Sequence, residues 1–176
     1  MSAAPDPGLF YTALMLRKLH ELRPFRRVLD ASAEGRYRAV LAEQLPGAAW
    51  IGAEEAWAPV LSELRLRRRD EGLDLTDIRI AAAPLAGVDI ALFEGVFERL
   101  DAAGALDLTD AWLGNASLVL VALPAAFPMV PPGLAARFVA GERAVCLLSA
   151  DGERVRQAAQ LHTVIPAIVQ RITGAA

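Results

Sequence analysis

The sequence is poor in the residue types that build disulfides and metal centres. Its 176 residues include one cysteine and two histidines. A single cysteine forms no internal disulfide, and neither His20 nor His162 has cysteines or carboxylates near it at metal-ligand spacing. We therefore predict no metal site. We interpret Cys146, in the apolar segment 144–148, as a buried core residue and not as a nucleophile.

Lysine and long apolar runs are also scarce. Lys18 is the only lysine and the formal net charge is −3, whereas proteins that bind nucleic acid are usually basic. No stretch approaches the roughly 20 apolar residues of a membrane-spanning helix, and the N-terminus lacks an export-signal pattern. We expect a cytoplasmic protein with neither nucleic-acid nor membrane partners. Because 55% of the residues are hydrophobic, we expect an apolar surface that contacts a protein partner or a second copy.

Short apolar runs alternate with amphipathic segments along the first two thirds of the chain. Leu9 to Leu22 has helical periodicity, and the later apolar runs, bounded by turn residues, are typical of buried strands. The predicted strands are 27–31, 48–53, 77–82, 88–93 and 117–123, and the predicted helices between them are 34–45, 57–69, 96–100 and 107–113. This repetition indicates right-handed parallel crossovers.

The pattern is less regular after Pro124. Three prolines between residues 128 and 132 predict a loop, residues 133–139 a short helix, and residues 143–149 a sixth strand. A final helix is predicted from about residue 151, with a kink at Pro166.

These elements predict one α/β domain over residues 9–174, preceded by a flexible lead at residues 1–8. We expect a doubly wound, mostly parallel sheet of about six strands with helices on both faces. In such a sheet a ligand binds beyond the carboxyl ends of the strands, where the strand order reverses. The segment from Asp30 to Arg36, which follows the first strand, is therefore the expected binding region.

Several segments carry a resemblance to a known family. Val28-Leu-Asp-Ala-Ser-Ala-Glu-Gly-Arg-Tyr37 lies where that family has a glycine-rich first motif, and Ala49-Trp-Ile-Gly-Ala-Glu54 is similar to its second strand. Residues 88–100 and 112–124 are similar to its fourth-strand motif and fifth strand. In these segments the chain resembles class I S-adenosylmethionine-dependent methyltransferases. The resemblance implies a Rossmann-like fold, S-adenosylmethionine as cofactor, and cofactor contacts at Asp30, Ser32, Gly35, Glu54 and Glu94.

The departures from the family pattern concern the cofactor directly. The family has glycines at alternate positions after the first-strand aspartate, because only glycine lets the backbone approach the cofactor closely. Here Ser32, Ala33 and Glu34 occupy the loop, and Gly35 is left to stand in for the last glycine. The segment 80–84 also lacks the acidic residue that commonly contacts the adenine. These losses predict a narrower, more acidic pocket with weakened or lost cofactor binding.

Two further departures are expected. Arg99 stands where the family's fourth-strand motif has a histidine. The chain is also predicted to end in a helix after its sixth strand, whereas the family often closes with an antiparallel hairpin.

Each candidate residue has a structural interpretation beside the functional one. Asp30 either orders the cofactor loop or caps the next helix. Glu54 either binds the ribose, 24 residues after Asp30, or complements the dipole of the following helix. Glu94 either forms an acid and base pair with Glu98 on one helix face or belongs to a solvated helix start.

The function that follows is a methyltransferase-like protein with weakened or lost S-adenosylmethionine binding, acting as a partner or scaffold subunit. The alternative is an active methyltransferase on a small molecule, with an atypical cofactor loop. A third hypothesis is a binding module for another nucleotide or an acidic metabolite in the same crevice. No side chain is assigned a catalytic role.

Overall fold

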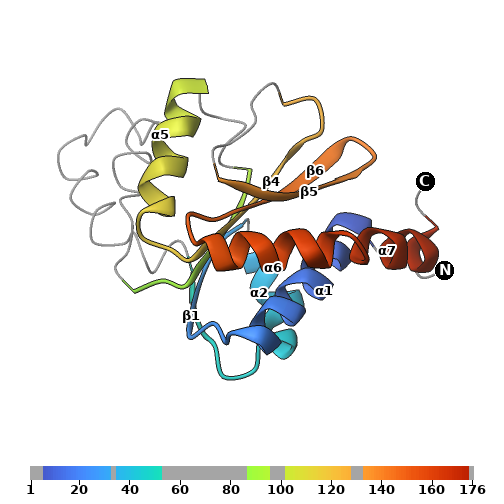
Figure 1. Ribbon diagram of the computed structural model, residues 1–176, viewed down its shortest axis with the longest axis horizontal. Coiled ribbons are helices and arrows are strands. Elements are labelled where there is room, and N and C mark those ends of the chain that lie inside the picture. The colour runs from blue at the N-terminus through green and yellow to red at the C-terminus, as the bar shows by residue number, and fades with distance from the viewer. Residues whose placement is uncertain (1–5, 33–34, 53–86, 96–101, 128–132, 175–176) are drawn as a thin grey trace, which may run out of the picture.

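A six-stranded sheet forms the centre of the molecule (Figure 1). The computed structural model describes residues 6–32, 35–52, 87–95, 102–127 and 133–174. The strand order is β2-β1-β3-β4-β6-β5, and the strands are β1 (Arg27–Ala31), β2 (Ala49–Gly52), β3 (Ile90–Glu94), β4 (Leu118–Pro124), β5 (Leu134–Ala140) and β6 (Arg143–Leu148). The first four strands pair in parallel, and β6 is antiparallel to both of its neighbours. Only β6 therefore runs against the other described strands, which confirms the predicted α/β class and mostly parallel sheet.

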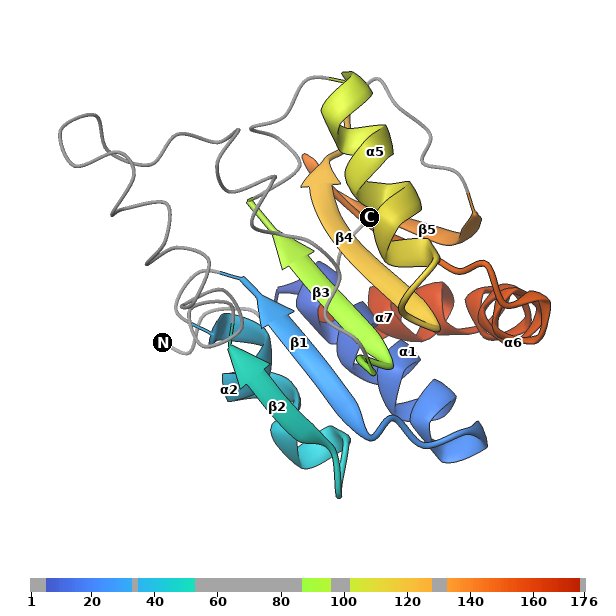
Figure 2. The ribbon, with the colours of Figure 1, turned by 90° about the vertical axis from the view of Figure 1, so that its left-hand side faces the viewer.

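Helices cover both faces of the sheet, as predicted (Figure 2). Helices α1 (Pro7–Leu22), α2 (Arg36–Leu41), α6 (Gly152–His162) and α7 (Ile165–Thr173) lie on one face, and α5 (Ala102–Leu113) lies on the other. Side chains alternate between the two faces along each central strand. In β3, Ile90 and Leu92 join the larger apolar core under α1, while Ala91 and Phe93 join the core under α5.

Helix α1 begins at Pro7, two residues before the predicted start at Leu9. Asp6 precedes it as the N-cap, and its Oδ1 accepts hydrogen bonds from the backbone N–H groups of Gly8 (2.9 Å) and Leu9 (3.2 Å). An aspartate cap followed by proline at the first helical position is a favoured helix start, because proline lacks the N–H that would otherwise stay unpaired.

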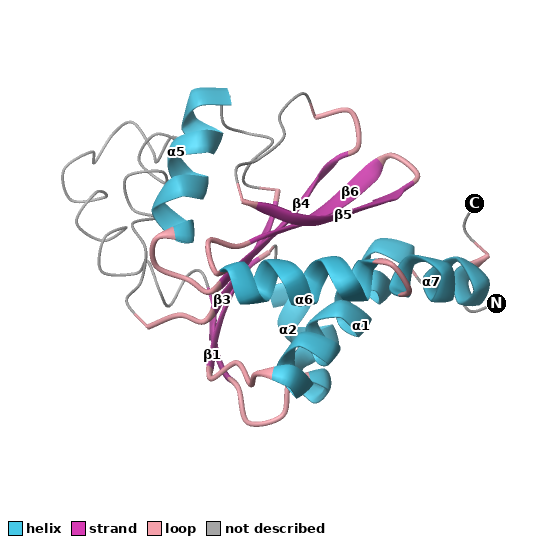
Figure 3. Cartoon of the chain, in the orientation of Figure 1, coloured by secondary structure: helices cyan, strands magenta, loops and turns pink. Residues whose placement is uncertain are grey.

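The region after β4 differs from the prediction. Residues predicted as a short helix at 133–139 form strand β5, which pairs with β6 in an antiparallel hairpin (Figure 3). The expectation that the closing hairpin is missing is therefore wrong. The last helix is not one kinked helix but two, because α6 ends at His162 and Pro166 lies in the first turn of α7.

Several predicted elements lie outside the described residues, namely the helices at 57–69 and 96–100 and the strand at 77–82. The described sheet has six strands, of which β5 was not predicted as a strand. Within the described part of the chain, no helix combines the length and apolarity needed to cross a membrane.

Candidate functional site

The strand order reverses at β1, which is flanked by β2 on one side and β3 on the other, with the chain crossing over between them. A parallel sheet of this kind leaves a crevice beyond the carboxyl ends of the two strands on either side of the reversal. Here those strands are β1 and β3. Asp30 and Glu94 lie at the carboxyl ends of these strands, and Ser32, Gly35 and Arg36 follow β1.

Asp30 is buried at the end of β1 and binds its own loop. Its Oδ1 accepts hydrogen bonds from the backbone N–H (3.0 Å) and the hydroxyl (2.5 Å) of Ser32. Its Oδ2 accepts from the backbone N–H of Arg38 (2.7 Å) in the first turn of α2. The carboxylate therefore both orders the loop and caps the helix, so the two interpretations of Asp30 describe one set of contacts.

Ser32 and Gly35 complete the turn into α2. The Ser32 hydroxyl, bound to Asp30, also accepts from the backbone N–H of Tyr37 (3.3 Å). Gly35 has φ +67°, and a Cβ added to it would lie 3.9 Å from Oδ2 of Asp30. Glycine is thus favoured at this position by the left-handed backbone and not by lack of space.

Glu94 lies at the end of β3 and not on a helix face, which corrects the predicted placement beside Glu98. Its side chain is 15% exposed, and Oε1 accepts from the guanidinium groups of Arg36 (2.8 Å) and Arg143 (3.4 Å). Arg36 also donates to Oδ2 of Asp6 (2.6 Å), the residue that caps α1. Four alternating charges therefore connect the first turn of α1, the first turn of α2, the end of β3 and the start of β6.

We call Asp6, Arg36, Glu94 and Arg143 the crevice network. The network lines one pocket, whose other lining residues are mostly apolar and include Leu9, Tyr37, Ala122 and Val145. The free cavity amounts to about 30 Å³, which holds little more than a water molecule. As the described residues line it, this pocket between α1, α2, β3 and β6 is too small for a nucleotide-sized ligand.

A phenol beside the pocket and a thiol in the core both have raised pKa values. Burial raises the pKa of the Tyr37 phenol well above its ordinary value, and the carboxylate of Glu94 acts in the same direction. Burial likewise raises the pKa of the Cys146 thiol, which lies in the core under α5. Both side chains therefore stay protonated near neutral pH. Among the described residues, no group of histidine, cysteine and acidic side chains is arranged to hold a metal ion.

Some predicted residues cannot be placed. Glu54 and Glu98 lie outside the described residues, as do Ala33, Glu34 and the segment 80–84. Of the five predicted cofactor contacts, the structure brings Asp30, Ser32 and Gly35 together in one turn, with Glu94 at the end of the neighbouring strand β3.

Comparisons with known proteins give a similarity to a solved structure and no family match. Neither the protein-family models nor the curated proteins contain a match to the sequence. Among solved structures, the chain is similar to "Putative methyltransferase yhhF from Escherichia coli". The two share 17% sequence identity with a TM-score of 0.48, over 85% of this chain and 90% of that chain.

Sequence reasoning did not find Asp6 or Arg143 as parts of the site, and it placed Arg36 at the end of the expected binding region without assigning it a contact. Each pairs with a residue at least 30 positions away, and no local motif marks such a pair. The available signal was positional. Arg36 follows the loop after the first strand, and Glu94 ends the strand that lies beside that loop in the sheet. A charge pair across the crevice could therefore be predicted once the strand order was known.

Proposed function

We propose that this protein is a methyltransferase-like α/β protein with weakened or lost S-adenosylmethionine binding, which acts as a partner or scaffold subunit. The observation that carries the proposal is the engagement of Glu94 by Arg36 and Arg143 across the crevice. A ligand entering there would have to separate these charges and displace the first turn of α1, which Asp6 attaches to Arg36.

The free-energy cost of opening the crevice comes more from apolar packing than from the ion pairs. The arginine side chains are about half exposed, at 44% for Arg36 and 50% for Arg143, and ion pairs with such exposure contribute at most about 1 kcal/mol each. Opening the pocket would also expose apolar side chains such as Leu9 and Val145 to water. Asp30 adds to the same tendency, because both of its carboxylate oxygens already accept hydrogen bonds within the loop.

The alternative function is an active S-adenosylmethionine-dependent methyltransferase on a small molecule. One observation favours it. The turn after β1 keeps a glycine with a left-handed backbone at Gly35 and a buried aspartate at Asp30, whose carboxylate binds Ser32 and the first turn of α2.

Isothermal titration of the full chain with S-adenosylmethionine and S-adenosylhomocysteine separates the two functions. We expect no heat, or binding only in the millimolar range. Micromolar binding that is lost in Glu54→Ala would overturn the proposal and support the active enzyme. Glu153→Ala is the matched control, because Glu153 is an exposed carboxylate on α6 that contacts Arg156 and Gln157.

A further inference from the structure

The outer side of α7 exposes three aligned aliphatic side chains. Val164, Ile168 and Ile172 are 56%, 40% and 56% exposed, and residues four apart lie on the same side of a helix. The inner side of the helix is buried, with Ile165 and Val169 in the core beneath α1. Single exposed apolar residues are common, but a row of three along one helix indicates a contact surface. We call these three residues the α7 stripe.

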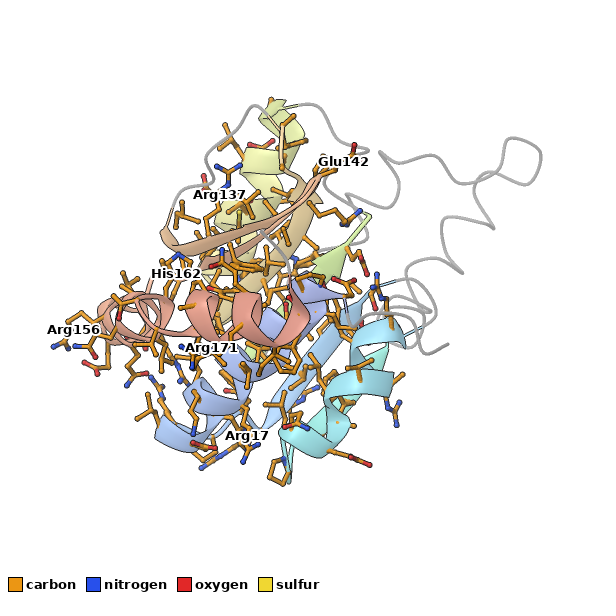
Figure 4. All side chains as sticks on the ribbon, turned by 90° about the vertical axis from the view of Figure 1, so that its right-hand side faces the viewer. Arg17, Arg137, Glu142, Arg156, His162 and Arg171 are labelled. Atoms are coloured by element: carbon orange, nitrogen blue, oxygen red, sulfur yellow. The ribbon has the colours of Figure 1, made fainter. Side chains whose placement is uncertain are left out.

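The segment that contains the α7 stripe carries positive charge without acidic side chains. Residues 157–176 contain no aspartate or glutamate. Arg171 is exposed next to Ile172 and has no ion-pair partner among the described residues. Figure 4 shows Arg171 on the same side of the molecule as Arg17 of α1 and Arg156 of α6. These two arginines pair with glutamates of their own helices, which leaves Arg171 to face an incoming partner.

We propose that the α7 stripe docks an amphipathic helix of a partner protein, with apolar residues four apart and acidic residues beside them. Two helices pair by packing such rows against each other, and a carboxylate opposite Arg171 would set the register. This inference rests on the proposed scaffold role and names the class of partner.

A second copy of this chain fits the stripe less well than an acidic helix. Pairing two α7 helices would bring together two helices that both lack acidic side chains, so neither copy would supply a carboxylate opposite Arg171.

Fluorescence anisotropy with a labelled peptide tests the proposal on the full chain. The probe is a designed helix of about 18 residues, long enough to form a helix, with leucines four apart flanked by glutamates. Its twin has lysines in place of the glutamates. At low salt we expect the acidic peptide to bind at least tenfold more tightly than the basic one. Ile168→Glu should weaken binding of the acidic peptide at least tenfold, and Arg171→Glu should reverse the preference between the peptides.

Val40→Glu is the matched control, because Val40 is 44% exposed on α2, and this variant should bind as the parent does. Thermal melting checks that each variant is folded. Equal binding of both peptides, or binding unchanged by Ile168→Glu, would overturn the proposal. Two other results would also overturn it. One is a dimer in analytical ultracentrifugation that Ile168→Glu abolishes, and the other is sedimentation with phosphatidylserine vesicles that Ile168→Glu abolishes. Because the peptide assay does not depend on S-adenosylmethionine, its failure is distinguishable from failure of the titration in the preceding subsection.

Discussion

At the scale of single residues, a buried arginine joins α6 to α1. Arg154 is 1% exposed and donates to the carbonyl oxygens of Leu19 (3.0 Å) and Arg23 (2.8 Å) at the end of α1. Its guanidinium carbon lies 4.7 Å from the centre of the Phe25 ring. Burial lowers the pKa of Arg154, but the carbonyl groups at the end of a helix and the face of an aromatic ring both stabilise a cation.

We therefore expect Arg154→Met to lower the free energy of unfolding by about 1–3 kcal/mol, because the Arg23 carbonyl loses the hydrogen bond from Arg154 and the Leu19 carbonyl keeps only the bond from the backbone N–H of Arg23. Urea denaturation measures this. Arg156→Met on the same helix is the control, since its side chain is 72% exposed and its removal should cost less than about 0.5 kcal/mol. Equal losses in the two variants would contradict this role, because the buried hydrogen bonds of Arg154 would then contribute no more than an exposed ion pair.

His162 gives the stability a pH dependence. Its Nδ1 lies 2.8 Å from the hydroxyl oxygen of Tyr11, and burial lowers the pKa of His162 below its ordinary 6.5. The unfolded chain therefore binds more protons than the folded one as the pH falls through about 6.5, so the free energy of unfolding decreases there. The loss is complete below the folded pKa. We expect the urea midpoint to fall between pH 7.5 and pH 5, and to fall less in His162→Gln. An unchanged difference between the two pH values in the variant would contradict this role.

At the scale of elements, the β5–β6 hairpin depends on two glycines with different surroundings. Gly133 and Gly141 both have positive φ, at +70° and +58°. A Cβ on Gly133 would lie 2.9 Å from the carbonyl oxygen of Ser149 and 3.1 Å from Cδ1 of Leu113, whereas a Cβ on Gly141 meets nothing within 4 Å. Gly133 is therefore required by space as well as by backbone conformation.

The two positions form a matched pair for mutation. Gly141→Ala should destabilise the protein by about 1 kcal/mol, the cost of left-handed backbone for a residue with a side chain. Gly133→Ala should cost more, about 2–4 kcal/mol, because the hairpin must also move away from Ser149 and Leu113. Thermal unfolding of both variants measures the difference. If Gly141→Ala is the more damaging, the close approach at Gly133 is relieved at no cost and the argument is wrong.

The first turn of α1 offers a second pair of variants, because the two oxygens of Asp6 have separate tasks. Oδ1 caps the helix and Oδ2 pairs with Arg36. Asp6→Asn keeps a good N-cap and loses the ion pair, so we expect a loss below about 1 kcal/mol. Asp6→Ala loses both and should cost about 1 kcal/mol more. Urea denaturation at low and high salt checks this, since only the ion-pair part should shrink with salt.

At the scale of the whole molecule, the sequence predicted β1 to β4 and β6 as strands and missed the edge strand β5. β1 was predicted with its observed bounds, because Val28 and Leu29 form a short apolar burst between polar turns. β5 was missed because Leu134-Ala-Ala-Arg-Phe-Val-Ala140 is rich in alanine, leucine and arginine, which favour helix. Pairing with β6 overrides that local preference.

The site was predictable to the same extent. Asp30, Ser32 and Gly35 could be assigned to one turn because they are close in sequence and follow a strand. The crevice network could not, because its pairs join segments that only the fold brings together. The strand order decides which charged residue lies beside the end of a given strand, and this order cannot be read from a single sequence.

The packing of α1 has a consequence for synthesis of the chain on the ribosome. Tyr11 stacks on Phe138 of β5 with ring centres 4.4 Å apart and contacts His162, while Leu19 accepts the hydrogen bond from Arg154. These three partners of the helix are translated more than 100 residues after it. Until they emerge, the part of α1 that packs on β5, α6 and α7 lacks its native cover, so folding of the domain is completed only with its last third, and a chaperone that binds amphipathic helices would find that part of α1 exposed in the meantime.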